Sequence, residues 1–74
     1  MNKYEVMYNI KCQLEQINFS LQHMQMILDR AKRKEDIYNS VHTEEAIKYL
    51  NSVKSNLQQQ LNKLEQSNEN TLTK

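Results

Sequence analysis

Apolar residues between Val6 and Ala31 recur at alternating steps of three and four residues without a break. This spacing is a heptad repeat, which places its members along one side of a long α-helix. These residues form the seam of helix 1: Met7, Ile10, Leu14, Ile17, Leu21, Met24, Leu28 and Ala31. A second apolar line repeats every seven residues on the opposite side of the helix and contains Cys12, Phe19 and Met26. Helix 1 therefore has two apolar sides to bury.

The C-terminal half carries a single apolar stripe at helical spacing, which predicts a second helix with one buried face. Its members are Ala46, Ile47, Leu50, Val53, Leu57, Leu61 and Leu64. Lys54 lies at the edge of the stripe, where its aliphatic stem can cover apolar surface. The chain contains no Gly and no Pro, which disfavours tight hairpins between strands and favours helices. We therefore predict an all-α fold, a coiled-coil-like antiparallel hairpin of two helices.

The connection between the helices is assigned from residues that suit a helix end or a helix start. Asn39 tolerates the left-handed backbone that often ends a helix. Thr43, followed by two acidic residues, is typical of an N-cap, and Ser40 is a competing one. The alternative is one unbroken helix, because no Gly or Pro enforces a turn. The predicted segments of a single domain at 1–74 are helix 1 at about 3–38, a loop at about 39–43, helix 2 at about 43–67 and a frayed tail at 68–74.

Folding back near residue 41 pairs the two apolar stripes in a definite register. The expected neighbours are Leu50 with Ala31, Leu57 with Met24, Leu61 with Leu21 and Leu64 with Ile17. Helix 1 is then longer than helix 2 by roughly ten residues, so its N-terminal segment overhangs. We expect the overhang and the second apolar line to contact another chain. These interface residues are Tyr4, Met7, Tyr8, Ile10, Cys12, Phe19 and Met26.

The size of the chain argues for a partner. A domain of 74 residues buries only ~60% of its unfolded surface and usually needs disulfides, a metal or oligomerisation. One cysteine cannot form an intrachain disulfide, and His23 and His42 with the distant Cys12 do not make a zinc site. We expect no cofactor, and a homodimer that forms a four-helix bundle, a larger protein partner, or both.

No arrangement of residues predicts catalysis or a small-molecule substrate, so we expect a protein that is not an enzyme. Glu44 and Glu45 adjoin a predicted helix start, where the helix dipole favours acidic side chains. The Cys12 thiol could act as a nucleophile only with an activating group beside it, but Lys11 projects about 100° away on the helix and His23 lies three turns distant.

A basic group near the predicted end of helix 1 is the one candidate for phosphate contacts, and contains Arg30, Lys32, Arg33 and Lys34. The helical hairpins that control plasmid copy number bind paired RNA loops and share this architecture, but no motif of theirs is present here. Acidic residues flank the group, and ten basic against nine acidic residues do not suit a general polyanion binder. Nucleic-acid binding and a purely structural assembly subunit therefore remain alternative hypotheses.

Localisation and source are also expectations from the sequence. The longest uncharged run, residues 16–28, is too short and too polar to span a membrane, and no signal peptide precedes it. A lone thiol suits the reducing cytoplasm. Abundant Asn, Lys, Ile and Tyr indicate an AT-rich genome, such as that of a phage or another mobile element. We predict a small regulatory or inhibitory protein that binds a larger host or defence protein.

Overall fold

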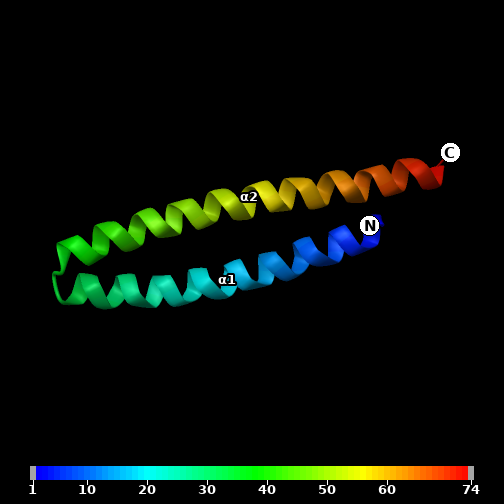
Figure 1. Ribbon diagram of the computed structural model, residues 1–74. Coiled ribbons are helices and arrows are strands. Elements are labelled where there is room, and N and C mark those ends of the chain that lie inside the picture. The colour runs from blue at the N-terminus through cyan, green and yellow to red at the C-terminus, as the bar shows by residue number, and fades with distance from the viewer. Residues whose placement is uncertain (1, 74) are drawn as a thin grey trace.

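A computed structural model describes the backbone of residues 2–73 and the side chains of residues 2–66. It contains two helices, α1 at Lys3–Arg33 and α2 at Ile37–Thr73. The helices lie antiparallel and side by side, and the molecule is a rod of 58 × 16 × 15 Å (Figure 1). The all-α hairpin predicted from the sequence is confirmed for the described residues, and the alternative of one unbroken helix is wrong.

The start of α1 is fixed by reciprocal side-chain bonds, in the manner of a capping box. Asn2 is the N-cap, and its Oδ1 accepts the backbone N–H of Glu5 at 2.9 Å. The Asn2 Nδ2 in turn donates to the Glu5 Oε1 at 3.3 Å. Glu5 also places a negative charge at the positive end of the helix dipole. The predicted start of helix 1 at residue 3 is therefore confirmed.

The turn is a Schellman motif, in which the last carbonyls of a helix are satisfied by the two residues that follow it. The Glu35 N–H donates to the Lys32 carbonyl at 3.1 Å, and the Asp36 N–H donates to the Ala31 carbonyl at 2.9 Å. Glu35 has φ 57°, the left-handed conformation that glycine usually adopts at this position. A glutamate therefore occupies a backbone position that is unfavourable for it, in a chain without glycine.

Asp36 lies directly after the turn and immediately before α2. Its Oδ1 accepts the backbone N–H of Asn39 at 3.1 Å, which makes it an N-cap. The predicted loop at 39–43 is therefore wrong: Asn39, Ser40 and Thr43 all lie inside α2. The predicted ends of helix 1 at 38 and of helix 2 at 67 are also wrong, because α1 ends at Arg33 and α2 runs to Thr73. The predicted fraying of 68–74 falls on residues whose side chains the structure does not describe.

The earlier turn changes the register of the hairpin. Leu61 packs with Ile10 and Leu14 in the hydrophobic core rather than beside Leu21. The predicted pairing of Leu64 with Ile17 is wrong for the same reason, because Leu64 packs against the cluster of Ile10, Leu14 and Leu61. The predicted overhang of helix 1 is wrong too, since α2 is now the longer helix and extends past the start of α1 (Figure 1).

Burial along the hairpin is uneven. Among the described side chains, one buried group lies near the chain ends, and comprises Ile10, Leu14 and Leu61. A second lies near the turn, and comprises Leu28 and Ala31. Between them the seam residues of both helices are only half-buried, and one of them is the charged Lys54. No described side chain is fully buried, so the hairpin by itself has a thin core.

Candidate functional site

One side of α1 presents large apolar side chains to solvent, opposite the side that packs on α2. We define the outer face of α1 as Tyr4, Tyr8, Cys12, Phe19 and Met26. Phe19 is the most exposed of them, with 74% of its surface accessible. Tyr4, Tyr8 and Met26 are each more than 60% accessible, and Cys12 is half-buried. An isolated exposed apolar residue needs no explanation, but a row of them along one helix face is a candidate interaction surface.

Two members of the outer face interact with each other. A side-chain hydrogen bond joins Tyr8 to Cys12, one helical turn further along α1. This bond is the largest cause that raises the pKa of Tyr8 above 10.0, and the charge of Cys12 adds to it. Glu15 raises this pKa further, because its negative charge disfavours a tyrosinate nearby. Tyr8 therefore stays neutral to higher pH than an isolated tyrosine.

Two residues predicted to contact another chain lie instead inside the hairpin. Ile10 is only 5% exposed, within the core cluster, and Met7 packs against that cluster. Both face α2 because the turn at 34–36 brings the far part of α2 alongside the start of α1. Ile10 is therefore not accessible to a second protein in this hairpin, whereas Met7 is half-buried.

Sequence reasoning missed a second exposed apolar group, on α2. Its members are Ile37, Tyr38, Val41 and Tyr49, each at least 50% exposed. The rings of Tyr38 and His42 meet edge to face, with centroids 4.5 Å apart. Tyr38 and Tyr49 are eleven residues apart, close to three helical turns, so they lie on one side of α2. This spacing is visible in the sequence, but it has structural meaning only once residue 38 is assigned to α2.

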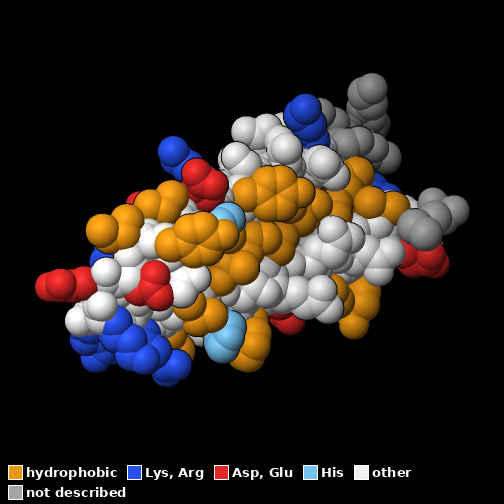
Figure 2. All heavy atoms as spheres, turned by 60° about the vertical axis from the view of Figure 1, so that its left-hand side comes forward, with side chains coloured by type: hydrophobic (Ala, Val, Ile, Leu, Met, Phe, Trp, Pro, Cys, Tyr) orange, Lys and Arg blue, Asp and Glu red, His pale blue; other side chains and the backbone are white. Residues whose placement is uncertain are grey.

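Figure 2 shows hydrophobic side chains gathered in a band that follows the contact between the two helices. The same face carries a group of Lys and Arg side chains at the turn end of the molecule (Figure 2). The apolar surface of the chain is therefore not confined to the outer face of α1. A partner could contact both helices at once.

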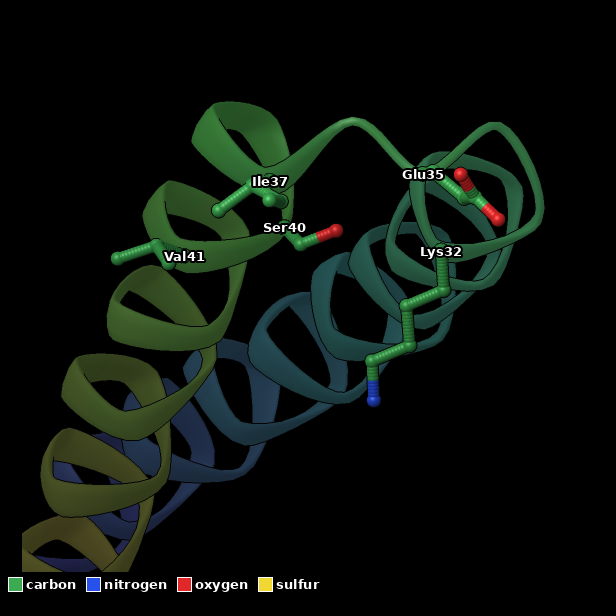
Figure 3. Close-up of a pocket in the computed structure, with 5 residues that line it drawn as sticks. All are labelled: Lys32, Glu35, Ile37, Ser40 and Val41. Atoms are coloured by element: carbon green, nitrogen blue, oxygen red, sulfur yellow. The ribbon is translucent and has the colours of Figure 1, made fainter.

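A shallow hollow of about 370 Å³ opens beside the turn, and is lined by Lys32, Glu35, Ile37, Ser40 and Val41. Ile37 and Val41 point away from α1, whereas the Ser40 hydroxyl points toward it (Figure 3). The lining has one cation, one carboxylate and one hydroxyl, all exposed or half-buried. No recorded hydrogen bond or ion pair joins the Ser40 hydroxyl to Lys32 or Glu35 in this hollow.

We define the basic end as Arg30, Lys32, Arg33 and Lys34, at the turn end of α1. The only salt bridge recorded among residues 2–66 joins the Lys32 Nζ to the Glu44 Oε1 at 3.7 Å, with both side chains more than half exposed. Arg30, Arg33 and Lys34 therefore have no acidic partner within the described hairpin. Their positive charges stabilise the negative end of the α1 dipole.

Neither a metal-binding cluster nor a membrane-spanning helix occurs in the described residues. No group of three or more His, Cys, Asp or Glu side chains there could hold a metal ion. No helix in that part of the chain combines the length and the apolar character needed to cross a membrane. No family model matches the chain, and no curated protein or solved structure matches it at a significant level.

Proposed function

We propose that this chain is a small regulatory or inhibitory protein that acts by binding other proteins and has no catalytic activity. Its partners would be a second copy of itself, in a four-helix assembly, and a larger protein of the host or of a defence system. We further propose that a phage or another mobile element encodes it and that it works in the cytoplasm. The unpaired thiol of Cys12 suits that reducing compartment.

The exposure of Phe19 carries the proposal. A phenylalanine that is 74% accessible on the outer face of α1 contributes little to the stability of its own hairpin. Burial against a partner would contribute about 1.5–3 kcal/mol for Phe19 and a similar amount for Met26. Aromatic side chains and Met are enriched at protein interfaces, which supports binding of a protein rather than a small molecule.

The test is capture of partners from the native host with a tagged chain, followed by binding measurements with the purified candidate. Phe19→Glu is expected to weaken that binding at least tenfold, because it places a charge in the interface. Asn18→Glu is the matched control, since it adds the same charge to an exposed neighbour on another side of α1. Equal affinities for the two variants would refute the role of the outer face.

A second candidate function is nucleic-acid binding by the basic end. Its support is that Arg30, Arg33 and Lys34 lack acidic partners within the described hairpin and lie together at the C-terminal end of α1. Each cation that contacts a phosphate adds about one unit to the slope of log affinity against log salt. Arg33→Gln with Lys34→Gln is therefore expected to lower both affinity and slope. An affinity that does not respond to salt would refute this function.

A further inference from the structure

The charged residues on the outer face of α1 are arranged so that the face complements itself. The exposed acidic residues beside the apolar row, Glu5 and Glu15, lie in the first half of α1. The exposed cationic or titratable ones, His23, Arg30 and Arg33, lie in the second half. Helical spacing places all five on the same side as Phe19.

We propose that the outer face of α1 binds the same face of a second copy, antiparallel, with a two-fold axis at Phe19. This inference rests on the proposed function in one respect, because both require the outer face to bind protein. It goes further by assigning the face of α1 that the second copy occupies and the orientation of that copy. The first argument for it is the position of the apolar residues. Cys12 lies seven residues before Phe19, and Met26 lies seven residues after it. Cys12 of one copy would therefore face Met26 of the other copy across the axis.

The second argument is charge. In the same antiparallel register, residues at equal distances from Phe19 become neighbours. Glu5 then meets Arg33 of the other copy, and Glu15 meets His23 of the other copy. Tyr8 meets Arg30 of the other copy, where the guanidinium can lie against the aromatic ring. In these pairs Arg33 gives Glu5 a partner of opposite charge, and His23 gives Glu15 a partner that can form a hydrogen bond.

Parallel pairing brings like charges together, because every charged residue would then face the same residue of the other copy. Glu15 would lie beside Glu15 and Arg33 beside Arg33, and like charges at these positions are unfavourable. Neither Glu15 nor Arg33 has a salt-bridge partner within the described part of its own chain, so both are available for pairing between chains. The charge order along α1 therefore selects the antiparallel orientation.

The third argument is area. An aromatic side chain buries about 150–250 Å² in an interface, and Tyr8 and Phe19 each have at least two thirds of their surface accessible. Together with Met26 they form the apolar centre of the proposed contact, and the stems of the flanking charged residues would add to it along the 31 residues of α1. A stable interface buries roughly 800 Å² per partner, which requires the charged stems as well as the three apolar side chains.

The experiment is disulfide formation between copies of the purified full chain. In Met26→Cys, the new thiol would face Cys12 of the other copy, and mild oxidation should give a covalent dimer whose mapped bridge joins positions 12 and 26. An intrachain bridge is excluded, since fourteen residues of helix separate these positions by about 21 Å. The control is Tyr49→Cys, which adds an equally exposed thiol on α2 and should not give efficient crosslinking.

A charge exchange tests the orientation without a new thiol. Arg33→Glu is expected to weaken self-association about tenfold in sedimentation equilibrium, because the new carboxylate would face Glu5 of the other copy and two like-charge contacts would form per dimer. Arg33→Glu combined with Glu5→Arg should restore association, since the exchanged charges again face opposite partners. Failure of the second change to restore it would overturn the antiparallel register.

The other possible outcomes of these experiments also support or overturn the proposal. A 12–12 bridge in the unmodified chain would overturn the antiparallel arrangement in favour of a parallel one. A chain that stays monomeric at high micromolar concentration, with equal crosslinking of Met26→Cys and Tyr49→Cys, would overturn self-association altogether. If that monomer still binds a host protein in a manner sensitive to Phe19→Glu, the proposed function stands and only this inference fails. If the dimer forms but no host protein binds, this inference stands and the proposed binding to a host protein fails.

Discussion

The carboxylate of Asp36 accepts two hydrogen bonds from Asn39, one from the backbone N–H at 3.1 Å and one from the side-chain Nδ2 at 2.6 Å. This pair fixes the first turn of α2. Asp36→Ala is expected to lower the free energy of unfolding by about 1 kcal/mol, as loss of an N-cap does. Asp29→Ala is the matched control, because its one recorded bond is to Gln25 on the exposed surface of α1. Equal loss in both variants, measured by urea denaturation, would contradict the cap.

The left-handed conformation of Glu35 predicts that a substitution at this position can raise the free energy of unfolding rather than lower it. A non-glycine residue there costs roughly 1–2 kcal/mol, and glycine removes this cost while adding backbone entropy to the unfolded chain. Glu35→Gly should therefore stabilise the hairpin by about 0.5–1 kcal/mol. Glu45→Gly, inside α2, should destabilise it by about 1 kcal/mol. Thermal unfolding of both variants provides the check, and a lower midpoint for Glu35→Gly would contradict the turn.

The register of the helices is tested by a double-mutant cycle. Ile10→Ala and Leu61→Ala each remove a side chain that is 5% exposed, and each should cost about 2–5 kcal/mol. Because these residues share one cluster, we expect a coupling energy of about 0.5–3 kcal/mol between them. Leu21→Ala with Leu61→Ala should show no coupling. Sulfate or another stabilising salt keeps the variants folded during urea titration.

The pKa of Tyr8 gives a prediction on pH. The hydrogen bond with Cys12 raises this pKa, so Cys12→Ala should lower it toward its ordinary value. In an absorbance titration of tyrosinate, the difference between the two chains should disappear when Tyr8 is replaced by Phe. A raised pKa in the folded state means that the stabilisation is present at lower pH and lost as the pH rises through that pKa. An unchanged titration in Cys12→Ala would contradict the contact.

The sequence predicted the class of fold and the inner side of α1 well, because both depend on a regular pattern. Ile10, Leu14, Leu28 and Ala31 belong to the heptad seam, and all four are buried. An uninterrupted repeat over four heptads leaves little choice of helix face. The absence of Gly and Pro correctly favoured helices over strands.

The position of the turn could not be predicted in the same way. The heptad spacing of α2 continues back from Ile47 through Thr43 and Ser40 to Asp36, and all three are polar although they are half-buried. The apolar stripe therefore begins about ten residues after the helix does. The left-handed residue is a glutamate, which composition does not single out. This one error in the turn also produced the wrong register, the predicted overhang and the expectation that Ile10 is open to a partner.

The uneven burial along the hairpin has a consequence for how it opens. Side chains are buried near the turn, at Leu28 and Ala31, and near the chain ends, at Ile10, Leu14 and Leu61. Amide hydrogen exchange follows local stability, which is greatest where apolar contacts are dense. Backbone amides around Lys54, and around Ile17 and Leu21 in α1, should therefore exchange faster than those of the two buried groups. The weakest part of this rod would be its middle, and Phe19 lies on the other side of α1 at that same level.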